Sequence, residues 1–157
     1  SLIEEAGPNE ILEVRAIVEP GFARVAATRR SEAGLAAIEA MVLEMESDVR
    51  EGRHGWEPDV GFHRAVAAAT RNPFAELMLN TLAERMQKRL WKLARERNFE
   101  TLHRGKRYAQ DHRAIFEAIR VGDGDAAFRL MHAHIRTIQA DLEAERTLLQ
   151  VNNAETG

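Results

Sequence analysis

Apolar residues recur at helical spacing along almost the whole of this chain. In one segment, Leu35, Ile38, Val42 and Met45 follow one another three or four positions apart, which places them on one face of an α-helix. No segment shows the alternation of apolar and polar residues, rich in β-branched side chains, that is typical of strands. The pattern predicts an all-α fold. Six or seven helices with short connections predict an antiparallel bundle.

Capping and turn residues divide the chain into these helices. Ser31 is a favourable N-cap, and Asn72-Pro73 combines an N-cap with proline at the first helical position. Gly122 ends one helix, and Asp123 or Asp125 caps the next. Helices are therefore expected over approximately residues 9–29, 31–49, 58–70, 72–98, 107–121 and 123–149.

Several segments are expected to interrupt or end the helices. Pro20-Gly21 predicts a kink or a split in the first helix, because proline removes a backbone donor. Residues 50–56 contain two glycines and predict a loop. The basic residues 103–106, with Gly105 among them, predict a break. Residues 151–157 predict a frayed terminal tail.

Length, charge and composition exclude several classes of protein. The 157 residues suffice for one domain with a substantial core, taken here as residues 1–157. A net charge of -3 argues against a nucleic-acid-binding surface. The absence of cysteine excludes disulfides, thiolate metal sites and thiol nucleophiles. No run approaches the roughly 18 apolar residues of a membrane span, and the N-terminus lacks the features of a signal peptide. A cytoplasmic protein that does not contact membranes is expected.

Polar residues occupy the apolar stripes of three predicted helices. Asp59 and His63 are four positions apart, so their side chains share one helix face. His112 and His134 fall among the apolar residues of the 107–121 and 123–149 helices. A carboxylate and three imidazoles are therefore expected to point into the bundle. Buried polar groups need partners, and a single divalent cation would serve all four.

These ligand types suit a transition metal. Imidazole and carboxylate without thiolate favour zinc first, and are also compatible with nickel, manganese, iron or cobalt. The residues alone leave an alternative open, in which each polar group is satisfied separately. A single histidine on an apolar stripe is more often a hydrogen-bonded core residue than a ligand, and local pairing explains Asp59 and His63 equally well.

Four segments taken together resemble a known family. The first is Glu13-Val-Arg15 with Ile17, Val18 and Glu19. The second is Asp59-Val-Gly-Phe62-His63-Arg-Ala-Val66 followed by Thr70-Arg-Asn72-Pro73. The third is Asp111-His112-Arg-Ala-Ile115-Phe-Glu-Ala118-Ile119 with Gly122-Asp123, and the fourth is Ala126-Ala127 through Met131 to His134-Ile135. In this order and spacing, over roughly residues 9–145, they resemble the FadR C-terminal domain (FCD). This is the effector-binding domain of one branch of the GntR-type transcription regulators.

The resemblance implies a helical bundle around a ligand cavity. In metal-binding members the ligands occupy the positions of Asp59, His63, His112 and His134, and a small organic-acid or sugar-acid effector binds beside the metal. Complete regulators of this kind carry an N-terminal winged helix-turn-helix, which is expected to be absent from this chain. We therefore expect an excised effector-binding domain that forms homodimers and reaches DNA only through the absent domain; the alternative is a stand-alone relative of such domains.

Four further residues are candidates for contact with the effector. Arg15 lies on the apolar stripe of the first helix, where it can make a bidentate contact to an anion or pair with a neighbouring glutamate. Arg85 and Arg89 can face inward from the 72–98 helix, although such side chains more often extend to the surface. Tyr108 lies one turn before His112 and is expected to offer a hydrogen bond to the cavity.

Three functions compete at this point. The sequence favours a sensor, in which the metal and Arg15 bind an effector that modulates DNA binding. A metal-dependent enzyme would need a general acid or base near the metal, and only Tyr108 lies on an inner stripe; we therefore do not expect an enzyme. A metal-free helical interaction module would satisfy Asp59 locally and would be indifferent to chelators.

Overall fold

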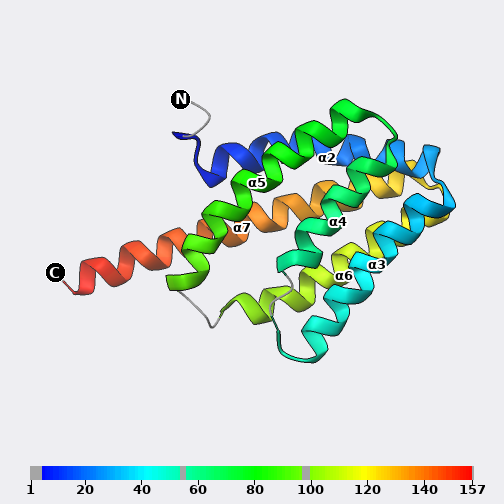
Figure 1. Ribbon diagram of the computed structural model, residues 1–157. Helices are drawn as coiled ribbons and strands as arrows, with labels where there is room; N and C mark the ends of the chain where they lie inside the picture. The colour runs from blue at the N-terminus through cyan, green and yellow to red at the C-terminus, as the bar shows by residue number, and fades with distance from the viewer. Residues whose placement is uncertain (1–4, 54–55, 97–99, 157) are drawn as a thin grey trace.

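The computed structural model describes residues 5–53, 56–96 and 100–156, and it describes the side chains of these residues except 56, 87–96 and 100–103. This part of the chain forms helices and no strand, which confirms the all-α prediction. The helices are α2 (Pro8–Arg29), α3 (Glu32–Arg50), α4 (Trp56–Ala69), α5 (Pro73–Glu96), α6 (Glu100–Arg120) and α7 (Gly124–Glu155), arranged as a bundle (Figure 1).

The predicted caps are confirmed by side-chain hydrogen bonds at the helix starts. The Ser31 side chain accepts a hydrogen bond from the backbone N–H of Gly34 at the start of α3. The Asn72 side chain accepts a hydrogen bond from the backbone N–H of Phe74 at the start of α5. The Asp123 side chain accepts one from the backbone N–H of Ala126 at the start of α7. Each bond satisfies one of the backbone donors that a helix start leaves free.

Two predicted interruptions are wrong. The chain does not break at residues 103–106, because α6 runs from Glu100 through Gly105 to Arg120. A glycine inside a helix costs only about 1 kcal/mol. A Cβ at Gly105 would lie 3.8 Å from Val49 of α3, an ordinary van der Waals distance, so the glycine faces the neighbouring helix α3. Residues 151–155 are also helical rather than frayed, since α7 extends to Glu155.

The other boundaries differ less from the predictions. The helix α2 includes Pro20 and is not split there. The helix α3 continues to Arg50, and α4 begins at Trp56, ahead of the predicted start. Gly122 adopts a φ of 78° between α6 and α7, a left-handed conformation that glycine adopts without steric cost.

The bundle is held together by an apolar core to which each described helix contributes, α5 through Met86. The helix α2 packs most extensively against α7, and α6 contacts both α3 and α7. Each of these helices and α4 places at least one fully buried side chain in the same cluster: Leu12, Ile38, Phe62, Ile115 and Met131. Burying one such side chain stabilises the fold by about 1.5–3 kcal/mol. In the described part of the chain, no helix is both long and apolar enough to cross a bilayer.

Candidate functional site

Three buried imidazoles from three different helices meet inside the bundle. His63 of α4, His112 of α6 and His134 of α7 are at most 4% exposed, and ring nitrogens of all three lie within 4.8 Å of one another. Apolar packing fixes their position, since the ring of His112 stacks on Phe62 at a centroid distance of 4.0 Å. The Nε2 atoms of His112 and His134 are 3.1 Å apart.

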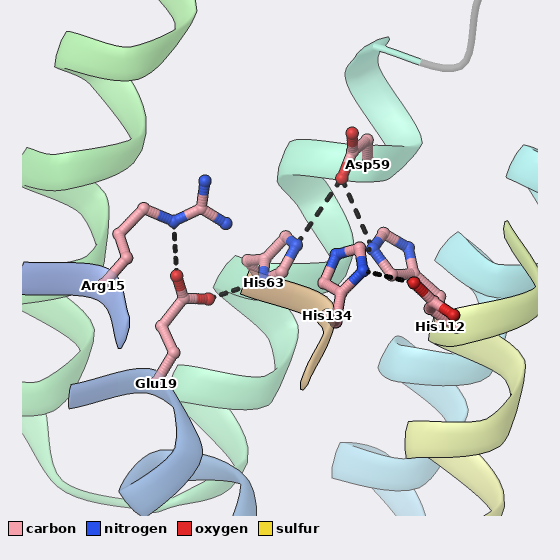
Figure 2. A network of polar contacts seen from close by, with 7 residues as sticks. Arg15, Glu19, Asp59, His63, His112 and His134 are labelled. Carbon is pink, nitrogen blue, oxygen red and sulfur yellow. Dashed lines mark hydrogen bonds and ion pairs between the residues drawn. The ribbon is translucent and has the colours of Figure 1, made fainter. Parts of the chain in front are cut away.

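Asp59 adds a carboxylate to this cluster. It lies one turn before His63 on α4, and its Oδ1 atom is 3.5 Å from Nε2 of His63 and 3.5 Å from Nε2 of His112. Figure 2 shows the carboxylate above the three rings. The structure therefore brings together the four residues that were predicted as metal ligands.

The geometry of this donor set fits a single metal ion. In a tetrahedral site with metal–nitrogen bonds of about 2.0–2.1 Å, neighbouring donor atoms are about 3.3 Å apart. The separations of 3.1 and 3.5 Å among His63, His112, His134 and Asp59 lie on either side of this value. Moreover, the buried Nε2 atom of His63 has no hydrogen-bond partner in the described part of the chain. Such an atom is costly to bury unless it has a ligand.

Two further carboxylates orient the rings from behind. Glu19 of α2, only 1% exposed, lies 2.5 Å from Nδ1 of His63, and Asp111 of α6 lies 2.9 Å from Nδ1 of His134. A carboxylate that accepts from Nδ1 of a histidine leaves Nε2 free to bind a metal. Neither residue was predicted from the sequence as a member of the site. Glu19 could have been found from its position one turn after Arg15, whereas Asp111 precedes His112 and carries no periodic signal.

The charges of the site set the protonation of its acids and rings. Burial alone would raise the pKa of Glu19, but the charges of Arg15 and His63 outweigh it and lower this pKa to about 2. Burial likewise opposes ionisation of Asp59, yet the surrounding histidines hold its pKa well below the usual range. Burial lowers the pKa of His112 and that of His134. Both rings are therefore neutral at physiological pH, the state that binds a metal.

Arg15 links the cluster to an adjoining cavity. Its Nε atom donates to Glu19, so the predicted pairing with a neighbouring glutamate is present. The rest of the guanidinium extends beside His63 (Figure 2). Arg15 is 8% exposed and also lines the cavity. Its ion pair with Glu19 and its position at the cavity, which were predicted as alternatives, therefore occur together.

The cavity has a volume of about 110 Å³. Because one water molecule takes up about 30 Å³ in the liquid, the cavity has room for roughly four waters or for a small organic acid. The described residues that line it are Arg15, Met45, Arg53, Asp59, Val60, His63, Leu79, Ala83, Met86, Arg104, Gly105, Tyr108, Ile138, Asp141, Leu142 and Glu145.

Of the other three residues predicted to contact the effector, the structure places one at the cavity. Tyr108 lines the cavity; its ring packs edge-on against His134 at a centroid distance of 5.5 Å, and its hydroxyl donates to Asp141 at 2.5 Å. Arg85 is half-buried on α5 and is not among the described residues that line the cavity. The side chain of Arg89 lies outside the described residues.

Comparison with known proteins finds one matching domain family and relatives that are named transcription regulators. The model of the FCD domain family matches residues 10–137. The chain is 36% identical over 119 residues to the galactonate operon transcriptional repressor of Escherichia coli strain K12, covering 73% of this chain and 48% of that protein. It is 28% identical over 144 residues to the HTH-type transcriptional regulator LutR of Bacillus subtilis, covering 88% of this chain and 63% of the relative. The chain thus spans about half to two thirds of the length of these relatives.

Solved structures share the fold. A GntR protein of Streptococcus agalactiae superposes with a TM-score of 0.72 at 23% identity, covering 85% of this chain and 58% of that protein. The E. coli protein McbR/YncC superposes with a TM-score of 0.73 at 15% identity, covering 87% and 64%. At these identities the likeness concerns the helical fold alone.

Proposed function

The chain belongs to the FCD domain family, and we propose that it is the effector-binding domain of a GntR-type transcription regulator that binds one divalent transition metal and a small organic acid. The observation that carries this proposal is the convergence of three buried histidines and Asp59 beside a cavity that Arg15 also lines. The matched relatives are regulators rather than enzymes, which supports a sensing role.

The chain's own residues have distinct parts in this proposal. His63, His112, His134 and Asp59 hold the metal, with zinc as the first choice and nickel, manganese, iron or cobalt as the others. The metal would supply a positive charge and an open coordination position for one oxygen of the effector. Arg15 would donate to the effector carboxylate through its Nη groups. Its Nε atom remains with Glu19.

The proposed output is a change in DNA binding by a part of the regulator that this chain does not contain. The relatives are longer than this chain, and one of them is named a helix-turn-helix regulator. An effector alters DNA affinity only if it binds two states of the regulator with different affinity. We propose a cytoplasmic regulator in which ligand binding at the metal shifts that equilibrium, with no membrane partner.

We also propose that the domain is a homodimer with an apolar face on α2 and α5. These helices pack against each other, and they expose large apolar side chains: Ile17 is 70% exposed, Leu77 61% and Phe74 76%. Large exposed apolar side chains on two helices that contact each other are typical of interaction surfaces. A second copy of the chain is the occupant that we expect, since the resemblance to the family implies dimers.

Elemental analysis of the untagged protein tests the metal site. About one equivalent of a divalent transition metal is expected, and His112→Ala should lose it together with thermal stability, because metal binding adds to the free energy of folding. His132→Ala is the matched control, since His132 is exposed on the same helix as His134. A protein that contains no metal, and that zinc, nickel and manganese do not stabilise, would favour the metal-free interaction module instead.

A further inference from the structure

The early part of α6 forms an outer part of the cavity wall. Arg15, His63 and Leu79 line the cavity from buried positions, whereas Arg104 and Gly105 line it from half-buried positions. The three histidines of the proposed metal site are at most 4% exposed. A metal ion or an acid can therefore reach them from water only through a temporary opening of the bundle.

Residues 104–108 of α6 have little tendency to form a helix by themselves. Gly105 lowers the stability of a helix, and Arg104 and Arg107, three positions apart, place like charges next to each other on the helix surface. The sequence alone predicts a break here, yet α6 continues through it. Contacts with other helices must therefore hold this stretch in its helical form.

Two carboxylates of α7 supply such contacts. Asp141 accepts a hydrogen bond from the hydroxyl of Tyr108 at 2.5 Å and pairs with Arg107. Glu145, one turn further along α7, pairs with Arg104. We call these three contacts the α6–α7 clip. The side chains of Asp141 and Glu145 are only 18% and 19% exposed, so these bonds are stronger than bonds at an open surface.

Residues 104–108 can leave their place without disrupting the apolar core. Among the described residues, the α6 side chains that belong to the core begin at Ile115, two turns beyond Tyr108. Gly105 has no side chain to withdraw from the cavity wall. Opening this stretch therefore breaks the α6–α7 clip and the contact of the Tyr108 ring with His134, but buries or exposes little else.

Resting on the proposed function, we propose that residues 104–108 are a gate to the metal cavity, which the α6–α7 clip holds shut and which opens by local loss of helix. The gate sets how fast a metal ion or an acid enters and leaves. Because Tyr108 joins Asp141 to the ring of His134, the gate closes directly against the metal site. An open state that is rarely populated changes the rates of entry and release by the same factor, so the affinity stays almost unchanged.

Stopped-flow transfer of zinc from the loaded protein to a chromogenic chelator tests the gate. The chelator concentration is raised until the rate no longer depends on it, so that the rate reports release. Asp141→Ala removes two contacts of the α6–α7 clip and should speed release by about tenfold. Glu143→Ala is the matched control and should leave the rate unchanged, because Glu143 lies on the same helix with its side chain 69% exposed. If Asp141→Ala does not fold, Tyr108→Phe keeps the aromatic ring, removes one bond of the clip and should also speed release.

Gly105→Ala tests the same gate in the opposite direction. Alanine favours the helical form, and its Cβ would lie 3.8 Å from Val49, which is ordinary contact rather than a clash. Zinc release should therefore slow by about fivefold. Gly21→Ala is the matched control, because Gly21 lies inside α2 and a Cβ there meets nothing within 4 Å. Alanine favours helix at that position too, but away from the gate, so the release rate should not change.

Zinc affinity and amide hydrogen exchange distinguish a gate from a damaged metal site. The gate variants should bind zinc within about twofold of the wild-type affinity. In the metal-free protein, the amides of residues 104–108 should exchange faster in Asp141→Ala and slower in Gly105→Ala. Release rates that stay constant in both variants, or that change in proportion to the affinity, would overturn the gate.

The outcomes also separate the gate from the function on which it rests. A wild-type protein that binds no zinc would overturn the proposed metal site. The exchange of amides 104–108 would then decide the gate by itself, and equal exchange in the wild type and both variants would overturn it as well.

Discussion

Glu19→Gln removes one charge from the most enclosed ion pair of the site and leaves the shape of the side chain almost unchanged. Glu19 is 1% exposed and lies between Arg15 and His63 (Figure 2). Glutamine resembles the protonated acid, so the substitution should cost about as much as protonating Glu19 in the folded protein. Arg15, at 8% exposed, would then retain a buried charge without a counter-ion.

The pKa of Glu19 gives the size of this effect. It falls from the usual 4.5 to about 2 in the fold, and one unit corresponds to about 1.4 kcal/mol. The ionised form of Glu19 therefore contributes about 3 kcal/mol to the free energy of unfolding at neutral pH. This agrees with the roughly 3–5 kcal/mol commonly lost when a buried ion pair is broken by removing one partner.

Urea denaturation in the presence of a chelator measures the cost without a contribution from bound metal. The free energy of unfolding of the wild type should exceed that of Glu19→Gln by about 3 kcal/mol at pH 7. The control Glu13→Gln, at an exposed position of the same helix, should change this free energy by less than about 0.5 kcal/mol.

The difference must also depend on pH in one direction. Because the pKa of Glu19 is lowered by folding, its contribution is complete above about pH 4.5 and is lost as the pH falls toward 2. The gap between wild type and variant should therefore narrow below about pH 4.5. A cost under about 1 kcal/mol, or a gap that stays constant on acidification, would refute the assignment of Glu19 as a buried ionised partner.

Three further predictions concern the metal and the assembly. Asp111→Asn should weaken zinc affinity by about 10–100-fold, because Asp111 orients His134. The control Asp125→Asn, at an exposed position, should leave zinc affinity unchanged. Competition with a chromogenic chelator measures the zinc affinity of each variant, and equal affinities would exclude the role of Asp111. Bound metal should be released as the pH falls from about 7 to 5, because protons then compete with the metal for the histidines. The charge of Glu19 outweighs burial and raises the pKa of His63, which favours this release. Equilibrium dialysis followed by elemental analysis measures the metal content, and a constant metal content would contradict the prediction. Leu77→Arg should convert the proposed dimer to a monomer in light scattering, and an unchanged mass would exclude the α2–α5 face as the interface.

The local sequence determined the helices and the faces on which the site residues lie. Ser31, Asn72 and Asp123 cap the helices as their side chains predict, because a cap bond joins residues only two or three positions apart. The apolar period around His112 and His134 was enough to expect both rings in the core, and both are at most 1% exposed.

The predictions that were wrong have the same local origin. A glycine among basic residues predicted a break at Gly105, but α6 continues through it because packing against α3 outweighs a cost of about 1 kcal/mol. Intrinsic propensity is therefore a weak guide where tertiary contacts are available.

The contacts between individual atoms of the site depend on how the helices pack. Glu19 and His63 are 44 positions apart, and Tyr108 and Asp141 are 33 apart, so no helical period relates the members of either pair. Their contact depends on the crossing and register of helices that pack across the core. A helical pattern specifies which face of a helix is buried, whereas the position of that face along its neighbour is decided by the packing of the whole bundle. The chain's own sequence thus put carboxylates and imidazoles inside the fold, and the packing of α2, α4, α6 and α7 made them one site.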